Sequence, residues 1–260
     1  MGIKVAKFGG SSLADAACFR KVRAIVEADP EIRFVVPSAP GKRAPGDIKI
    51  TDLLYMSVDA VRSGQDYASV FARVRARYLE IAQDLGLSQD LEAELDNIEK
   101  SIRDGCSSDY AASRGEYLNA KLLSESLGFP FVDAADLICF RAGDGSYDDE
   151  TTQWWSRKLE SMDCAVIPGF YGRRVDGGVR TFSRGGSDIT GSIVARAVHA
   201  DLYQNWTDVS GFMMADPRIV TDPQVIRVVT YSELRELSYM GATVLHEDSI
   251  FPVRRAGIPI

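Results

Sequence analysis

The sequence predicts an α/β protein, a three-layer αβα sandwich in which helices cover both faces of a mostly parallel central sheet. Two observations support this fold class. Short apolar segments typical of buried strands alternate with segments of helical periodicity. A long stretch between residues 51 and 128 is almost entirely helical in pattern, which indicates a helical insertion between strands. The 260 residues, 45% hydrophobic and 26% charged, suffice for one large domain, which we expect to span residues 1–260.

The first predicted unit is a strand, a turn and a helix. Residues 3–8 have strand character and end at the glycine pair 9–10. Residues 15–28 are predicted to form a helix, because their apolar side chains fall on one face. A second strand is expected over residues 33–37, and a polar loop follows through residue 50.

Helices are predicted through the whole stretch from residue 51 to residue 128. Three of them are marked by apolar residues at helical spacing, over residues 53–61, 70–81 and 91–102. A longer one spans roughly residues 107–127 and ends at Gly128, because glycine readily adopts the left-handed conformation that closes a helix.

Strand character returns in the second half of the chain. Strands are predicted over the segments 131–134, 164–168 and 202–206, and the segment 171–182 is predicted to form a hairpin. Helices are expected over residues 231–239 and near Ala242. Residues 256–260 begin another apolar strand and then stop, which indicates either a fragment of a longer protein or a natural truncation.

Charge and composition exclude several classes of protein. A net charge of −7 argues against a general nucleic-acid-binding surface, so no nucleic-acid partner is expected. The start of the chain lacks the apolar core of a signal peptide, and no apolar run approaches membrane-spanning length, so no membrane association is expected. The cysteines are widely spaced and indicate neither a disulfide framework nor a zinc site, which favours the reducing cytoplasm: Cys18, Cys106, Cys139 and Cys164.

The most informative segment is the approach to a helix at residues 181–188. Glycines 185–186 let backbone N–H groups approach a ligand closely, and Ser187 or Asp188 can cap the helix whose N-terminus favours an anion. Arg184 adds donors suited to a carboxylate or a phosphate. The alternative is an ordinary capped helix after a glycine turn, and the segment alone does not decide between the two.

A second glycine pair follows the first predicted strand. Lys7 ends that strand, Gly9 and Gly10 form the turn, and Ser11 opens a helix. Backbone donors, a cation and a helix N-terminus together are typical of a phosphate site, although the lysine precedes the glycines, unlike in a Walker A motif. The competing interpretation is a tight turn beside a solvated lysine.

Two further segments carry polar groups of interest. Gly115 lies inside a predicted helix, which costs about 1 kcal/mol relative to alanine and indicates close approach of a ligand or another backbone. Glu116 would then be placed to bind a substrate ammonium, whereas the alternative is an incidental surface pair of Arg114 and Glu116. Thr207 and Asp208 follow a predicted strand at the end where α/β proteins bind ligands, although turn chemistry explains them equally well.

In this order, the segments resemble those of the aspartate kinases of the amino-acid kinase family. The resemblance covers nearly the whole chain, and residues 113–116 together with 184–188 separate aspartate kinases from relatives that act on glutamate, carbamate or nucleotides. It rests on residues 7–12, 38–54, 113–116, 182–188, 206–209, 215–218 and 241–246. It implies the amino-acid kinase fold and transfer of the γ-phosphoryl group of ATP to the side-chain carboxylate of L-aspartate. The products would be 4-phospho-L-aspartate and ADP, in the first step of lysine, threonine and methionine biosynthesis.

The resemblance also implies roles for individual residues. Lys7 would neutralise charge on the transferring phosphoryl group, and Asp188 would orient Lys7 or assist at the metal. Arg184 would pair with a carboxylate of L-aspartate and Glu116 with its ammonium, while Thr51 and Ser187 would add hydrogen bonds. ATP would be held by Lys7, Phe8, Gly9, Gly10, Ser11, Thr207, Asp208, Met213, Arg218, Thr243 and Val244. Mg²⁺ would bridge the phosphates, and no residue is assigned as a metal ligand.

The chain departs from the family pattern at two of the expected nucleotide positions. Met213 stands where the family often has a tyrosine, and Thr243 stands where it often has a lysine. Both replacements leave the affinity for ATP and the nucleotide preference open.

The resemblance also implies which further domains and which partners to expect. Full-length aspartate kinases usually carry ACT-type regulatory domains after this one, so a catalytic domain without amino-acid feedback is expected here. A homodimer would be weakened without that region. Two alternative functions stay open: an amino-acid kinase with another acceptor, and a non-catalytic binding module descended from a kinase.

Overall fold

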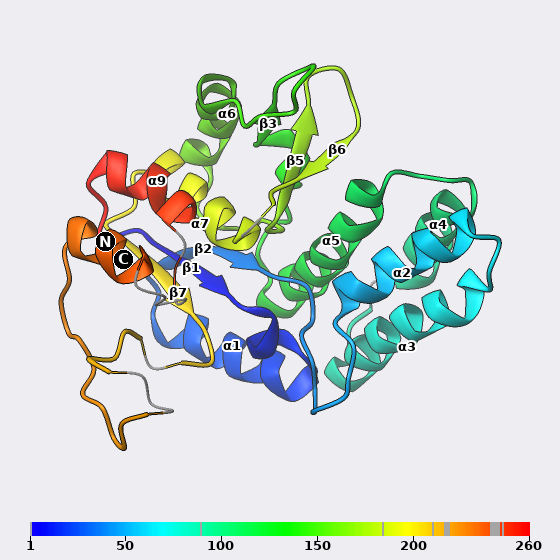
Figure 1. The fold of residues 1–260 in the computed structure, drawn as a ribbon, viewed down its shortest axis with the longest axis horizontal. Coiled ribbons are helices and arrows are strands. Elements are labelled where there is room, and N and C mark those ends of the chain that lie inside the picture. The colour runs from blue at the N-terminus through cyan, green and yellow to red at the C-terminus, as the bar shows by residue number, and fades with distance from the viewer. Residues whose placement is uncertain are drawn as a thin grey trace.

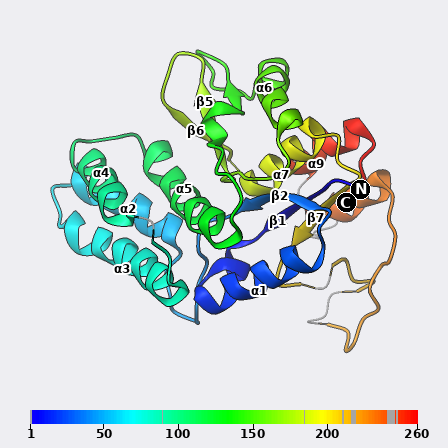
Figure 2. The same ribbon diagram turned by 180° about the vertical axis from the view of Figure 1, so that it is seen from behind.

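The central sheet of the protein is parallel and has the strand order β4-β2-β1-β7 (Figures 1 and 2). The computed structural model describes residues 2–88, 90–183, 185–209, 211–215, 219–239, 245 and 247–260. The strands are β1 (Lys4–Phe8), β2 (Ile32–Pro37), β4 (Ala165–Val166) and β7 (Leu202–Trp206). Strands β1 and β2 are almost wholly buried, as expected of apolar strands covered on both faces.

A separate hydrophobic core lies on each face of this sheet. One core joins Ala6 and Phe8 of β1 to α1 (Ala16–Ala28) and to the helices between residues 50 and 127, which we call the helical block. The other joins Val5 of the same strand to α7 (Gly186–Ala197) and α9 (Glu247–Ala256). Because successive side chains of a strand point to opposite faces, the two cores confirm the predicted three-layer arrangement.

The helices predicted between residues 51 and 128 are present as α2 (Ile50–Arg62), α3 (Tyr67–Leu85), α4 (Leu91–Arg103) and α5 (Ser108–Leu127). Side-chain oxygens of Asp66, Asp90 and Ser107 accept hydrogen bonds from the first backbone N–H groups of α3, α4 and α5. Gly128 ends α5 in the left-handed conformation, as predicted, with a φ of 70°.

A small sheet of order β3-β5-β6 lies beside the central one. It contains β3 (Cys139–Phe140), β5 (Tyr171–Arg174) and β6 (Val179–Thr181), and the antiparallel pair β5–β6 is the hairpin predicted over residues 171–182. The strand predicted over residues 131–134 is wrong. Phe131 makes one bridge to Val166, and the Asp133 side chain then caps a short 3-10 helix, η2 (Ala134–Asp136).

The remaining described helices are η1 (Gly10–Leu13), α6 (Asp149–Ser156), η3 (Arg157–Ser161) and α8 (Tyr231–Tyr239). Helix α8 matches the prediction, whereas the helix expected near Ala242 lies outside the described residues. Helices α6 and α9 were not expected. Pro252 inside α9 argues against a helix from sequence alone.

The end of the chain is not a full strand. Gly257 adopts a left-handed φ of 71° after α9, and the Pro259 carbonyl accepts one hydrogen bond of 2.9 Å from the Tyr203 N–H of β7. Among the described residues, no helix combines the length and apolar character needed to cross a membrane.

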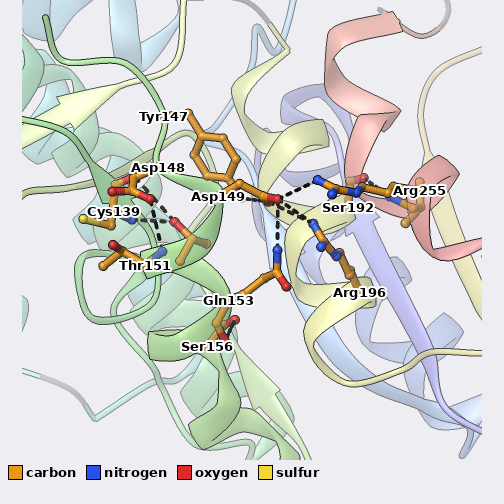
Figure 3. Close-up of polar contacts among 12 residues, drawn as sticks. Cys139, Tyr147, Asp148, Asp149, Thr151, Gln153, Ser156, Ser192, Arg196 and Arg255 are labelled. Atoms are coloured by element: carbon orange, nitrogen blue, oxygen red, sulfur yellow. Dashed lines mark hydrogen bonds and ion pairs between the residues drawn. The ribbon is translucent and has the colours of Figure 1, made fainter.

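Asp149, at the start of α6, holds α7 and α9 in place (Figure 3). Its carboxylate accepts hydrogen bonds from Arg196 of α7 at 2.9 Å and from Arg255 of α9 at 3.2 Å. The Ser192 hydroxyl of α7 also accepts a hydrogen bond from the Val253 N–H of α9. These contacts fix the helix that carries Ser187 and Asp188.

Candidate active site

A buried ion pair lies between strand β1 and helix α7. Lys7 is close to the carboxyl end of β1, and its Nζ is 2.7 Å from Asp188 Oδ1 in the first turn of α7. The lysine is only 8% exposed. A buried ammonium is tolerated only beside an opposite charge, and Asp188 supplies that charge and holds Lys7 in one position. The predicted catalytic residues are therefore in direct contact.

The turn predicted to bind phosphate, residues 9–11, comes shortly after Lys7, and we call it the phosphate-type turn. The Gly9 N–H donates to the Trp206 carbonyl of the neighbouring strand, and η1 begins at Gly10. The first N–H groups of a helix have no partner within it, so Gly10 and Ser11 lie where backbone donors are available to an anion. The ring of Phe8 stacks on that of Trp206 with centroids 5.9 Å apart.

Three glycines near the site allow other parts of the chain to pack closely against them, because they have no Cβ atom. A Cβ atom at Gly10 would lie 2.8 Å from the Ala39 carbonyl oxygen. A Cβ atom at Gly186 would lie 2.6 Å from the Phe170 ring, and one at Gly115 would lie 2.9 Å from the Ala39 Cβ. The close approach expected at Gly115 therefore comes from the loop after β2.

Residues 38–49 join β2 to α2, and we call them the bridging loop (Figure 1). The Gly41 N–H donates to the Gly10 carbonyl at 2.8 Å, and the Ala39 N–H lowers the pKa of the Glu116 carboxyl group. Thr51, in the first turn of α2, follows this loop directly. Sequence reasoning missed this connection, since no charged motif marks Ala39.

Glu116 is a buried carboxyl group, and no described lysine, arginine or histidine forms an ion pair with it. Burial raises its pKa to about 8, against the lowering effects of the Ala39 N–H and of the nearby Arg114 guanidinium. Its Oε2 atom has no hydrogen-bond partner in the described part of the chain. A buried carboxyl oxygen in this state favours a ligand that carries a positive charge.

The predicted nucleotide residues are only partly covered by the structure. Thr207 and Asp208 follow β7, where both are exposed and where the Thr207 hydroxyl donates to Asp208 at 3.1 Å. Met213 forms a bridge with Val225 in the segment that follows. Four of the predicted site residues lie outside the described residues: Arg184, Arg218, Thr243 and Val244.

One polar residue near Lys7 was not anticipated. Asn205 of β7 is the register partner of Lys7 of β1, so the two side chains leave the sheet on the same face. Its Oδ1 is buried and makes no hydrogen bond within the described residues. The available signal was an amide in an otherwise strand-like apolar segment.

No metal centre built from protein ligands is found in the described ranges, where histidine, cysteine, aspartate and glutamate form no group of three or more. Asp188 is the carboxylate nearest to the Lys7 ammonium. Magnesium ions often bind through one or two carboxylates plus substrate phosphates and water, and this site fits that mode rather than an all-protein cage.

The parallel sheet, the lysine–aspartate pair and the glycine turns define a kinase-like α/β domain. A model of the amino acid kinase family matches residues 2–260, so the chain belongs to this family. The chain is 38% identical over 272 residues to aspartokinase 3 of Bacillus subtilis, an alignment that covers 99% of this chain and 60% of the relative.

Solved structures of aspartate kinases are also similar to this chain. An aspartate kinase of Clostridium acetobutylicum has a TM-score of 0.93 and 50% identity, over 98% of this chain and 58% of that one. The E. coli aspartokinase III complex with aspartate and ADP has a TM-score of 0.83 and 28% identity, over 98% of this chain and 60% of that one. This chain thus spans about 60% of the length of each of these three relatives.

Proposed function

We propose that the protein phosphorylates L-aspartate with ATP, giving 4-phospho-L-aspartate and ADP. The observation that carries this proposal is the placement of two groups about the bridging loop: the Lys7–Asp188 pair, and the buried Glu116, whose Oε2 atom has no hydrogen-bond partner among the described residues. The similarity to aspartate kinases supports the same activity. The first step of aspartate-family amino-acid biosynthesis is the corresponding place in metabolism.

The reaction itself needs no general base. The side-chain carboxylate of aspartate is an anion at neutral pH, so one of its oxygens can attack the γ-phosphorus directly. A new oxygen–phosphorus bond forms, the bond from the γ-phosphorus to the bridging oxygen breaks, and ADP leaves with that electron pair. Catalysis then consists mainly of holding two anions together and neutralising their charge.

Lys7 provides the charge at the transferring group. Its ammonium is fixed by Asp188, so little reorganisation is needed when negative charge collects on the phosphoryl oxygens. The N–H groups of Gly10 and Ser11 would hold the ATP phosphates, whereas the Gly9 N–H is already bonded to Trp206. Mg²⁺, when bound with ATP, would neutralise phosphate charge beside Asp188.

Glu116 would recognise the amino-acid acceptor. Its carboxyl group is buried and its pKa is raised to about 8, so an incoming ammonium would restore the ionised form. We assign Arg184 to an aspartate carboxylate, with hydrogen bonds from Thr51 and Ser187, which is 8% exposed.

The nucleotide would lie beyond the carboxyl end of β7. Thr207, Asp208, Met213 and Arg218 follow that strand, and Thr243 with Val244 comes later in the chain. Met213 and Thr243 replace the tyrosine and lysine frequent in the family, so we propose a weakened or altered preference for ATP. Competition among ATP, GTP and CTP in the kinase assay measures this preference.

We further propose that residues 1–260 form a catalytic domain and that it works in the cytoplasm. The cysteines of the described chain are free thiols, which supports a reducing compartment.

An acceptor panel tests the proposal. ADP release would be measured with ATP–Mg²⁺ and each of aspartate, glutamate, N-acetylglutamate, carbamate and UMP. We expect turnover with aspartate at least tenfold above the others, because Glu116 and the predicted Arg184 match an α-amino acid. If another acceptor were preferred, the protein would be assigned as a related kinase that phosphorylates that acceptor instead of aspartate. Calorimetry that shows no binding of ATP–Mg²⁺ would favour a non-catalytic binding module.

A further inference from the structure

The bridging loop touches both halves of the proposed site. On one side the Ser38 N–H donates to the Phe8 carbonyl at 3.0 Å, and Gly41 is bonded to Gly10. On the other side the Ser38 carbonyl accepts a hydrogen bond of 2.6 Å from the Asn119 side chain, one turn after Glu116 on α5. A shift of this loop would therefore move the phosphate-type turn and the environment of Glu116 together.

The packing around the loop leaves no room for independent movement. A Cβ atom at Gly41 would lie 2.6 Å from the Gly10 carbonyl carbon. Ala39 fills the space that a side chain at Gly115 would need. Backbones in such close contact transmit displacement, because protein interiors are packed as densely as organic crystals.

A buried arginine from the helical block holds this loop. Arg77 of α3 is 4% exposed, and its guanidinium donates to Asp47 Oδ2 at 2.6 Å and to the Gly41 carbonyl at 3.1 Å. It also reaches the Ala14 carbonyl, directly after η1, at 3.4 Å. One side chain thus connects α3, the bridging loop and the end of the turn that starts at Gly10.

Asp47 completes the arrangement from within the loop. Its carboxylate accepts hydrogen bonds from the N–H groups of Arg43 and Ile48, both at 3.0 Å. The Arg43 N–H and the Arg77 guanidinium lower its pKa to about 2, against the opposing effect of burial. Asp47 therefore stays ionised over the neutral range, and the pair is a permanent contact.

We propose that Arg77 and Asp47 are positioning residues for the reaction, which set the bridging loop so that the phosphate-type turn and Glu116 face each other. This inference rests on the proposed aspartate kinase function. Neither residue is placed at the reacting atoms, so both act through Gly41 and Ala39. Asp47 lies in the segment 38–54, which is one of those that carried the family resemblance, whereas Arg77 lies outside all of them.

The test is the Asp47→Asn variant, which keeps the size of the side chain and removes its charge. We expect kcat for aspartate phosphorylation to fall about 10- to 100-fold, because small misplacements remote from the chemistry have effects of that order. Arg77→Lys, which keeps a charge, should show a smaller loss in the same direction. Asp96→Asn is the matched control, since Asp96 of α4 pairs at 2.6 Å with Arg75 of α3, the helix that carries Arg77, away from the loop. Its kcat should equal that of the wild type.

A pH profile separates positioning from general stability. The Ala39 N–H lowers the pKa of Glu116, so a loosened loop should move the pH limb of kcat/KM for aspartate to higher pH. Among the described residues, the other ionisable groups that interact with Glu116 are Arg114 on its own helix, Tyr78 on α3 and Tyr55 on α2, and Asp47→Asn removes none of them.

The outcomes are distinguishable. An inactive wild-type protein refutes the proposed function, and the positioning role falls with it. An active wild type with unchanged kcat and an unchanged pH limb in folded Asp47→Asn, even at a lower melting temperature, refutes the positioning role alone. Lower kcat together with the shifted limb, in Asp47→Asn and more weakly in Arg77→Lys, supports it.

Discussion

At the scale of single residues, the site contains two buried ionisable groups in opposite situations. Lys7 has its counter-ion in place, with Asp188 at 2.7 Å. In the described part of the chain, Glu116 forms no ion pair, and its Oε2 atom makes no hydrogen bond. The paired charge is suited to stabilising a reaction, and the unpaired one is suited to recognising a cation.

Replacing Lys7 by alanine tests the first role. We expect kcat to fall by a factor of about 100 to 1,000, equivalent to roughly 2.7–4 kcal/mol for one strong transition-state contact. ADP release in a coupled assay measures it. Lys4→Ala is the control from the same strand, since Lys4 pairs with Asp29 at the far end of β1. Turnover of Lys7→Ala at the wild-type rate would exclude the assigned role.

The pH dependence of aspartate recognition tests the second role. Burial raises the pKa of Glu116 to about 8, so the carboxyl group is neutral below that pH and ionised above it. An ammonium binds the ionised form, so kcat/KM for aspartate should rise with pH and level off near 8, by roughly tenfold per pH unit on the acidic side.

Glu116→Gln should lose most of this dependence together with most of its affinity for aspartate. Glu94→Gln, which alters a partly exposed carboxylate paired with Lys121, should keep the wild-type profile. A flat profile between pH 6 and 9 in the wild-type protein would contradict the role of Glu116.

At the scale of secondary-structure elements, glycines allow segments to meet at the site. Gly10 and Gly115 both face Ala39, from the end of β1 and from the interior of α5. Helix α5 can therefore place Glu116 beside the bridging loop only because residue 115 has no side chain. The same argument applies to Gly186, which lets α7 begin against Phe170.

Gly115→Ala tests this close packing. Alanine improves helix propensity by about 1 kcal/mol, but its Cβ would lie 2.9 Å from the Ala39 Cβ, and overpacking typically costs about 1–3 kcal/mol. We expect a small net loss of stability in urea unfolding and a clear fall in kcat/KM for aspartate. The exposed α4 substitution Asn97→Ala should leave kcat/KM unchanged, and wild-type kinetics in Gly115→Ala would show that the contact is not needed.

At the scale of the whole molecule, the proposed active site lies at the carboxyl-terminal end of the strands of the parallel sheet. A core on each face fixes the strands, and the Lys7–Asp188 pair lies where β1 meets the start of α7. Parallel sheets commonly bind ligands beyond the carboxyl ends of their strands, and the proposed site lies in that position. The helical block contributes Glu116 and, through Arg77, the support of the bridging loop.

Much of this arrangement could be predicted from sequence because it is local. The periodicities of β1, α3 and α5 and the helix end at Gly128 are properties of neighbouring residues. Helix α9 was missed because Pro252 is a local signal against helix that tertiary packing overrides. Helix α6 was missed because its residues show little apolar periodicity, and an Asp148 cap and contacts of Asp149 define it instead.

The supporting contacts of the site were beyond sequence reasoning for a different reason. Arg77 and Asp47 are thirty residues apart, and nothing in either segment shows that they meet. Likewise, Asn205 faces Lys7 only through the register of β1 with β7. Sequence patterns therefore identified the charged groups, and the structure was needed to find what holds them.

The central claim is that this chain transfers a phosphoryl group from ATP to a carboxylate of L-aspartate. Trapping the acyl phosphate with hydroxylamine tests it most directly, with aspartate and ATP–Mg²⁺ as substrates and Lys7→Ala in parallel. The account predicts aspartate hydroxamate from the wild-type protein, dependent on both substrates, and at least a hundredfold less from Lys7→Ala. Folded wild-type protein that forms no hydroxamate, or a Lys7→Ala variant that forms as much as the wild type, would contradict it.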